Sequence, residues 1–439
     1  MHSRSVPQLL AKEIRELFAS RAFWLLLLIV GVLIGHSFIT AVRTYAEMSG
    51  SGGGQAALPQ GLTPLDGILV PTWGAYDLAA TLLFPFVAIR LISSEKETGA
   101  LKLLLQLPGS LATKLAAKGL ALFLGWMIAW LPGLAAIVLW KSYGGHVAAP
   151  ETINLLLGHL LRGLLSAGVA VAAAGLAENA SSAAIATLGF TVGTWALDFI
   201  AAGRGGWLQH LASYTPTAAL RSFEQGLLKF STVGVMIALS VGGFAVTAVW
   251  LHTGRTLRNK LLASLLLIAT LSLICFASSR ILTSRDMSEN RRNSFSTGDE
   301  ATLRQLNQPL KLTIFLAPED PRLTDLEQGV LRKLRRVLGH RLDVKYAAGS
   351  QSGLFENTED HYGEIWYEMD GRKIVDRSTI EEVVLDQIYQ MAGLSGPTRS
   401  IEDGFGGYPL AAEPRKAAFV FYFLWPLLVI IGWWRFLKN

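Results

Sequence analysis

The stretch RLISSEKETGALKLLLQLPGSLATKLAAKG, residues 90–119, lies between two long apolar segments. Charged residues crowd its start, and the turn signal LPGS follows at residues 107–110. Between these features, Leu101, Leu104 and Leu105 recur at helical spacing. The pattern predicts a short amphipathic helix that lies outside the membrane rather than a membrane span.

The basic residues of this stretch indicate which side of a membrane it faces. Four of them lie outside the flanking apolar runs, and Arg90 sits at the edge of one; the four are Lys96, Lys102, Lys114 and Lys118. Short cytoplasmic loops of membrane proteins carry the excess of Lys and Arg. We therefore expect the segment to face the cytoplasm, where a soluble partner can push on its helix.

The overall composition is that of an integral membrane protein. The chain has 439 residues, of which 51% are hydrophobic and 16% charged, and its mean hydropathy is +0.38. The net charge of +6 comes from basic residues beside apolar runs, so membrane topology explains it and no nucleic-acid partner is expected. The single cysteine, Cys275, excludes an intramolecular disulfide and a Cys-based metal site, and it leaves the redox compartment open.

Apolar runs predict eight membrane spans. Residues 1–21 precede them as an interfacial amphipathic helix with Lys12, Glu13, Arg15 and Glu16 on its polar face, although a merely solvated leader is the alternative. Six spans follow within residues 22–255, a seventh at 261–278 and an eighth at 417–434. Small residues in spans four and five, which a short turn joins, predict that these two helices pack closely.

The region between the seventh and eighth spans, about 280–416, has the composition of a soluble module. A strand at 310–318, a helix at 325–341 and a strand at 342–347 predict a βαβ unit, and Asp370-Gly371 predicts a hairpin. A last helix should be capped by Ser378 or Thr379 with Glu382. The predicted fold is therefore an all-α membrane bundle, a six-span core plus two spans, with both termini cytoplasmic and a small extracytoplasmic α/β domain.

Motifs for catalysis are absent from the sequence. It contains no GxxxxGK[ST] phosphate-binding loop, no HExxH and no GxSxG. We expect the chain to be no enzyme, to hold no metal and to bind no cofactor itself. A membrane enzyme is the least favoured of the functions we consider.

A few ionisable and aromatic residues near span ends are candidates for a translocation path. These are Trp73, Tyr76, Asp77 and Asp198. Ionisable residues inside spans are costly and are a pointer to function. The alternative is that both aspartates sit at wet span ends or cap helices, and that the aromatic residues only pack.

The quoted stretch resembles the signature segment of ABC-2-type permeases. In that family a pattern E-x-E-x-G-T/A-L-x-x-L-L-x-x-P forms a cytoplasmic coupling helix, here at about 94–110. Residues 12–28, KEIRELFASRAFWLLLL, resemble the family's N-terminal interfacial helix, and LASYTPTAALRSFEQGLLKFS, at 211–231, resembles the half-helices before its last span. The residues that the resemblance assigns to ATPase coupling are Glu95, Lys96, Glu97, Gly99, Leu101, Leu104, Leu105, Pro108, Lys12 and Arg15. For Glu95 and Glu97 a solvated charge cluster is the alternative.

The segment after the seventh span, RDMSENRRNSFSTGDEATLRQLNQPLKLTIFLAPEDP at 285–321, is similar to the start of the auxiliary subunit of gliding-motility-type ABC transporters. Together the two resemblances imply an inner-membrane permease in two copies, or paired with a paralogue, on two separate ABC ATPase subunits that bind ATP and Mg. Lipids and an envelope partner of the extracytoplasmic domain are further expected contacts. Two functions follow: export of an amphiphilic or peptide-like substrate, or transmission of force to the external domain without export.

Overall fold

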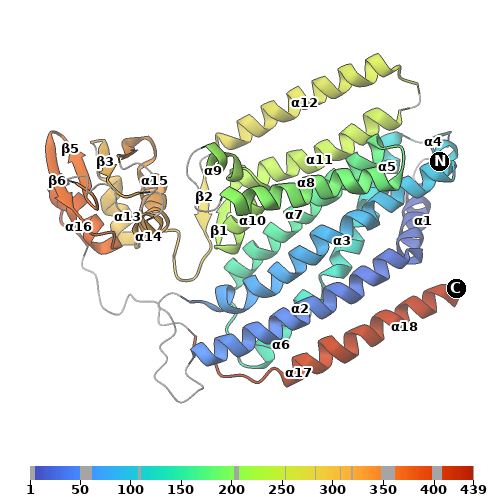
Figure 1. The fold of residues 1–439 in the computed structure, drawn as a ribbon, viewed down its shortest axis with the longest axis horizontal. Helices are drawn as coiled ribbons and strands as arrows, with labels where there is room; N and C mark the ends of the chain where they lie inside the picture. The colour runs from blue at the N-terminus through green and yellow to red at the C-terminus, as the bar shows by residue number, and fades with distance from the viewer. Residues whose placement is uncertain are drawn as a thin grey trace, which may run out of the picture.

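The computed structural model describes residues 5–49, 62–106, 110–201, 207–252, 254–281, 283–306, 308–317, 320–347, 361–397 and 408–438. It consists of a bundle of long helices and a separate small α/β domain at one end of the bundle (Figure 1). The opposite end carries α1 (Ser5–Ala19) and α4 (Ala100–Gln106) and lies next to both chain termini (Figure 1). We call these the domain end and the α4 end.

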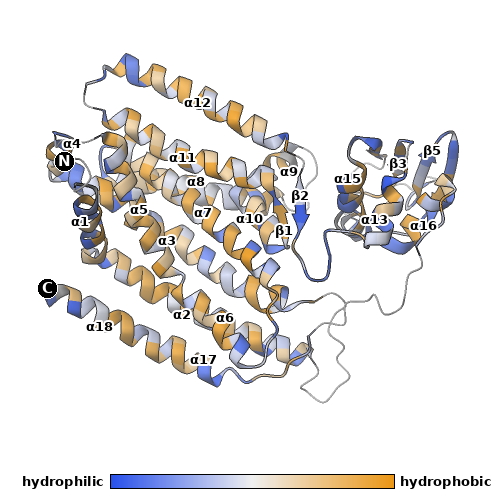
Figure 2. Cartoon of the chain, turned by 180° about the vertical axis from the view of Figure 1, so that it is seen from behind, coloured by the Kyte–Doolittle hydropathy of each residue, from blue (hydrophilic) through white to orange (hydrophobic). Residues whose placement is uncertain are grey.

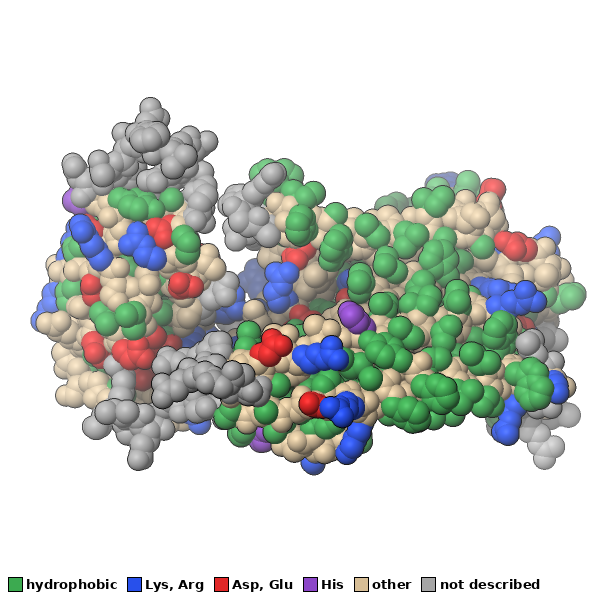
Figure 3. All heavy atoms as spheres, turned by 60° about the horizontal axis from the view of Figure 1, so that its bottom comes forward, with side chains coloured by type: hydrophobic (Ala, Val, Ile, Leu, Met, Phe, Trp, Pro, Cys, Tyr) green, Lys and Arg blue, Asp and Glu red, His purple; other side chains and the backbone are tan. Residues whose placement is uncertain are grey.

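Eight stretches of the described residues are long and apolar enough to span a membrane, which confirms the predicted fold class. They comprise α2 (Arg21–Met48); η2 (Leu65–Leu69) with α3 (Val70–Glu97); α5 (Leu111–Ala129) with α6 (Leu131–Ser142); α7 (Ala149–Leu176); α8 (Ala180–Ala201); α11 (Phe230–Leu251); α12 (Leu257–Ser279); and α17 (Arg415–Phe419) with η6 (Val420–Leu424) and α18 (Trp425–Lys438). Hydropathic colouring follows these helices, and charged side chains gather toward the two ends of the bundle (Figures 2 and 3).

The closest helix packing in the bundle differs from the prediction. Span four contacts span five, as expected, but its small residues approach span six more closely, because α7 and α11 come into backbone contact. A Cβ built on Gly243 of α11 would lie 2.2 Å from the carbonyl oxygen of Gly168 in α7. The Thr247 hydroxyl also donates to the Val171 carbonyl at 3.1 Å. Small residues let helix backbones approach in this way, and the nearest partner is not the next helix in the chain.

The α/β domain has a four-stranded sheet in the order β4-β3-β5-β6. Strand β3 (Leu310–Ile314) pairs in parallel with β4 (Leu342–Tyr346), so the predicted βαβ unit is confirmed; α14 (Pro321–Leu326), η3 (Glu327–Leu331), α15 (Arg332–Leu338) and η4 (Gly339–Arg341) form its crossover. Strand β5 (Ile365–Met369) pairs antiparallel with β3 and with β6 (Arg372–Asp376). Helices α13 (Thr297–Arg304) and α16 (Glu381–Ala392) complete the domain.

Two local details of the domain can be compared with the sequence patterns. The hairpin turn at Asp370 and Gly371 has φ values of 50° and 73°, as a tight type I′ turn requires, which confirms the hairpin. The predicted cap of α16 is wrong, because the helix begins after Ile380 and not directly after Ser378 or Thr379. Its N-cap is Ile380, which makes no side-chain cap hydrogen bond.

The connection between bundle and domain contains a small sheet that the sequence did not reveal. After α9 (Trp207–Ala212) and α10 (Pro216–Glu224), β1 (Leu227–Lys229) pairs antiparallel with β2 (Ser284–Asp286). Each strand has only three residues, too few for a period-2 pattern to register. The pairing fixes the start of the domain segment to the domain end of the bundle.

Candidate functional site

Helix α4 is a short amphipathic helix at one end of the bundle, as predicted. It follows Gly99, whose φ of +74° provides the sharp turn after α3. Leu101 and Leu104 are buried in a small apolar cluster with Leu115 and Leu251, whereas the side chain of Leu103 is 68% exposed. The helix therefore rests on the bundle with one face and presents a leucine on the other.

The flanks of α4 differ from the expected loop. Residues 90–97 continue α3, and residues 111–119 already belong to α5, whose N-cap Ser110 accepts a hydrogen bond from the Thr113 amide at 3.1 Å. The predicted coupling helix is thus shorter than about 94–110. The side chain of Leu105 and all of Pro108 lie outside the described residues.

A cluster of four charged side chains joins α1, α3 and α5 beside α4. The Lys118 ammonium lies 2.8 Å from Glu13 Oε2 and 3.0 Å from Glu95 Oε2, and it donates to the Leu91 carbonyl at 2.9 Å. Lys12 hydrogen-bonds to the other oxygen of Glu95. Lys118, Glu13 and Glu95 are buried. Each buried charge thus faces an opposite charge, the condition under which ions are tolerated away from water.

The pKa values of Glu13 and Lys12, the two members of this cluster that lie on α1, reflect their environment. Burial raises the pKa of Glu13, and the neighbouring Lys118 and Lys12 offset this only in part. Burial acts to lower the pKa of Lys12, but the hydrogen bond and charge of Glu95 and the charge of Glu13 outweigh it. The pKa of Lys12 is therefore raised above its usual range.

The position of Glu95 corrects the expectation that it lies on a partner-binding surface. Glu95 is 4% exposed and Glu13, expected on the water-facing side of α1, is fully buried. The reason is that α3 continues to Glu97 and that α1 packs against α3 and α5 (Figure 1), so that Glu13 meets Lys118. Of the two coupling residues on α1, Arg15 is exposed and Lys12 is half-buried.

The next two residues of α3 hold the facing ends of two other helices. The Lys96 ammonium donates to the carbonyl oxygens of Ala174 at 2.6 Å, Gly175 at 2.8 Å and Ala177 at 2.9 Å, at the C-terminus of α7. The Glu97 carboxylate accepts from the amide of Ala180, the first residue of α8, at 3.4 Å. A cation at a helix C-terminus and an anion at an N-terminus are the stabilising arrangement.

Glu95, Lys96 and Glu97 therefore form one unit, which we call the EKE junction. Through it the end of α3, directly before α4, is bound to α1, α5, α7 and α8. A displacement of α4 would be passed on to four helices of the bundle.

The residues predicted to line a translocation path divide into two groups. Trp73 and Tyr76 are fully buried and pack with Trp130, Trp126 and His159, and neither lines the cavity that Asp77 lines. Asp77 lines a cavity of about 390 Å³ between α3, α7, α8 and α10. Asp198 does not line it but forms an ion pair, at 2.6 Å, with Arg221, which does.

We call this cavity the membrane pocket. Three charged lining residues were missed from the sequence: Arg162, Arg221 and Glu224. The Arg162 guanidinium lies 3.6 Å from Asp77 Oδ1 and is 3% exposed. An arginine within the apolar run of span four was a usable signal, because ionisable residues inside spans are rare. Glu224 gave no such signal, because it lies among polar residues of a half-helix.

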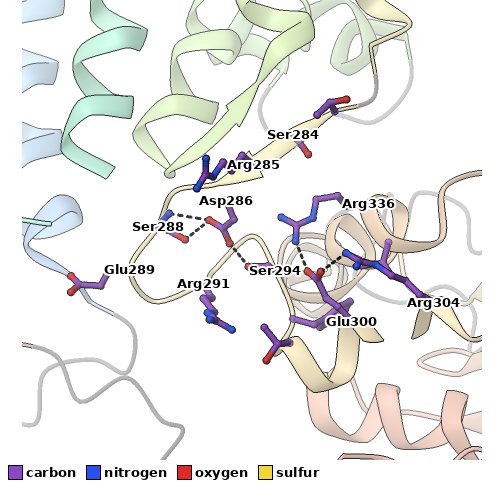
Figure 4. Close-up of a pocket in the computed structure, with 14 residues that line it drawn as sticks. Ser284, Arg285, Asp286, Ser288, Glu289, Arg291, Ser294, Glu300, Arg304 and Arg336 are labelled. Atoms are coloured by element: carbon purple, nitrogen blue, oxygen red, sulfur yellow. Dashed lines mark hydrogen bonds and ion pairs between the residues drawn. The ribbon is translucent and has the colours of Figure 1, made fainter. Parts of the chain in front are cut away.

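At the domain end, residues 284–295 form a tightly hydrogen-bonded segment that we call the junction loop. The Asp286 carboxylate accepts from the Ser288 amide at 3.0 Å, the Ser288 hydroxyl at 2.6 Å, the Asn293 amide at 3.1 Å and the Ser294 hydroxyl (Figure 4). Beside it, a cavity of about 580 Å³ reaches the domain, where Arg304 and Arg336 bind Glu300 (Figure 4). Asp286 therefore gives the loop a fixed shape.

The junction loop also binds several elements of the bundle. Arg292 pairs with Asp66 of η2. The amide of Glu289 donates to Glu151 of α7 at 3.1 Å, and the Glu289 carboxylate lies 2.9 Å from His146 Nε2, before α7. The Asn293 side chain donates to the Gln225 carbonyl, directly after α10, at 2.7 Å. The junction loop is thus fixed to the bundle at several points.

Comparison with protein families supplies the identity that this architecture suggests. The sequence matches the family described as ABC-2 family transporter protein over residues 8–290. The chain belongs to this family. Searches among curated proteins and among solved structures find no match.

An ABC-2 family transporter protein is a multi-pass membrane permease subunit of an ABC transporter and generally works with an ABC ATPase. The match runs from α1 through α12 and ends inside the junction loop. It includes α4, the EKE junction and the membrane pocket, and it leaves the α/β domain and the last span outside.

Proposed function

We propose that this chain is the membrane subunit of an ABC exporter, powered by separate ATPase subunits that bind ATP and Mg. The chain itself catalyses no reaction in this proposal. The observation that carries it is α4, a short amphipathic helix that presents Leu103 at the end of the bundle and is followed and preceded by long helices. Such a helix provides a contact on which a soluble subunit can act.

Force applied at α4 has a structural route into the bundle. The EKE junction binds the α3 end to α1, α5, α7 and α8, and two of these helices line the membrane pocket. Coupling requires that the ATP-bound and ATP-free ATPase prefer different arrangements of these helices, because only a differential affinity shifts an equilibrium.

In the orientation that we propose, the α4 end lies in the cytoplasm and the α/β domain lies on the outer side of the inner membrane. The basic residues at the α4 end, among them Arg255, Lys102 of α4 and Arg258 of α12, support it. Two copies of the chain, or this chain and a paralogue, would provide one coupling helix for each of two ATPase subunits. An amphiphilic or peptide-like cargo fits a pocket that is partly charged and partly apolar.

Purification of the full chain from native membranes in a mild detergent tests the proposal. We expect an ABC ATPase subunit to co-purify in equal copy number, and ATP hydrolysis to be found in the complex. Recovery of the intact chain without such a subunit, from cells that express its neighbours, would contradict the proposal.

The junction loop supports a second candidate function, transmission of force to the α/β domain without export. Its bonds to η2, α7 and the end of α10 tie the domain to helices that move if the bundle rearranges. The similarity of the segment at 285–321 to an auxiliary subunit of gliding-motility-type transporters fits this role, and an envelope component would then be the domain's partner.

Substitution of Asp286 by asparagine separates the two functions. The amide cannot accept as many hydrogen bonds, so we expect amide hydrogens of residues 284–295 to exchange at least about tenfold faster. Asp325→Asn, at an exposed aspartate of α14, is the matched control and should leave exchange unchanged. If the chain exports, ATP turnover of the complex should be the same in both variants. A severalfold change confined to Asp286→Asn would favour transmission.

A further inference from the structure

We propose that the membrane pocket binds the protonated amine of an amphiphile, with the Glu224 carboxylate as its counter-ion. The inference gives the exporter a substrate class. Only the statement that the bound molecule is cargo rests on the proposed function. Binding itself needs no ATPase.

The charged side chains around the pocket form two ion pairs, and one further carboxylate, that of Glu224, lines the pocket. Asp77 of α3 faces Arg162 of α7, and Asp198 of α8 faces Arg221 of α10. Within the described part of the chain, Glu224 makes no hydrogen bond or ion pair. A carboxylate without a partner in a poorly hydrated site is costly, and a ligand cation would offset that cost.

The pKa of Glu224 is consistent with a binding position for a cation beside its carboxylate. Burial raises its pKa to about 7, with the nearby Asp77 adding to the effect and Arg221 opposing it. Near neutral pH the group is thus divided between its charged and neutral forms. A bound amine stabilises the charged form, so the binding of the amine and the ionisation of Glu224 should reinforce each other.

The shape of the pocket fits an amphiphile. Its volume of about 390 Å³ is in the range of small-molecule sites. Its apolar residues include Leu78 and Val192, which are 56% and 43% exposed, and Trp195, which is 55% exposed. An alkyl chain can lie along these side chains. The indole ring of Trp195 offers a face to a cation. The buried Thr217 hydroxyl, which has no hydrogen-bond partner among the described residues, can accept from an amine.

An anionic head group fits this site less well. The charge of each arginine is already balanced by an aspartate, so a ligand anion would add a further negative charge close to Glu224. Repulsion between like charges is stronger where burial reduces screening by water, as it does at Glu224. The preference for an amine is therefore a matter of charge rather than of size.

Binding of three probes with the same twelve-carbon chain tests the inference: dodecylamine, dodecanol and dodecanoate. The full chain without ATPase is placed in nanodiscs of zwitterionic lipid, and binding is measured by calorimetry against empty nanodiscs. We expect dodecylamine to bind at least about tenfold more tightly than dodecanoate. Glu224→Gln should remove this preference while leaving dodecanol unchanged. Glu178→Gln, at an exposed glutamate of the α7–α8 turn, is the matched control and should retain the preference.

A pH profile provides a second readout. Dodecylamine should bind more tightly as pH rises through about 7, because Glu224 loses its proton there while the amine keeps its own. Asp77, Arg162 and Arg221 line the same pocket, and Asp198 pairs with Arg221 beside it; all four remain in wild-type form in the variant. Glu224→Gln should therefore flatten the profile, and Glu224→Asp should keep it.

Equal affinity for the amine and the carboxylate, tighter binding of dodecanoate, or an unchanged preference in Glu224→Gln would each overturn the inference. Size-exclusion profiles and the Glu224→Asp variant show whether a loss of binding reflects misfolding. Because no ATPase is present in this experiment, its failure leaves the coupling proposal intact. Equally, absence of an ATPase subunit in the native complex would not affect the binding result.

Discussion

Replacing Leu103 by aspartate should abolish recovery of the ATPase with this chain. Leu103 is the exposed leucine of α4, whereas Leu101 and Leu104 hold the helix on the bundle. Loss of a central apolar anchor costs about 2 kcal/mol or more in a protein interface, which is roughly a thirtyfold loss of affinity. The measurement is the ATPase-to-permease ratio after affinity purification of the chain.

Leu257→Asp is the control for this variant. Leu257 begins α12, is 64% exposed and lies toward the same end of the bundle, so the substitution introduces the same charge in a comparable setting (Figure 1). The Leu257→Asp chain should retain its ATPase. If Leu103→Asp also retains it, or if both variants lose it equally, α4 is not the site of a specific contact.

Among the substitutions considered, replacing Lys118 by methionine should cause the largest loss of thermal stability. The methionine side chain fits the space but leaves Glu13 and Glu95 buried with only the half-exposed Lys12 nearby. Breaking a buried ion pair by removing one partner costs about 3–5 kcal/mol. The midpoint of thermal unfolding of the purified chain in detergent should fall well below that of wild type.

Two further variants test the cause of that loss. Lys102→Met changes an exposed lysine of α4 and should leave the unfolding midpoint within the error of wild type. Adding Glu13→Gln and Glu95→Gln to Lys118→Met removes the uncompensated charges and should restore most of the midpoint. If the triple variant is no more stable than Lys118→Met, the loss arises from packing and not from charge.

The sequence predicts the architecture well because a bilayer imposes a simple rule. Spans need about twenty apolar residues, and all eight predicted runs correspond to long helices of the structure. Helix α4 could also be predicted, since its leucines have helical spacing and Gly99 allows a turn at its start.

The predictions that failed concern contacts between helices. Reasoning from helical periodicity treats each helix as if it contacted only lipid and water. It therefore assigned Glu13 and Glu95 to water, whereas both are buried against Lys118. Span four does contact the next helix in the chain, as predicted, but the same reasoning missed the closer contact of Gly168 with Gly243. These contacts depend on which surfaces meet in three dimensions, and a single sequence does not contain that information.

Cross-linking from position 103 tests the central claim most directly, namely that α4 receives force from an ATPase. A Leu103→Cys chain in which Cys275 is replaced by serine is treated with a short bifunctional thiol reagent in membranes that contain the complete transporter. We expect a cross-link to the ATPase subunit whose yield changes when ATP is added. Labelling of the introduced thiol from the outside of intact cells, with no cross-link to an ATPase, would contradict the account.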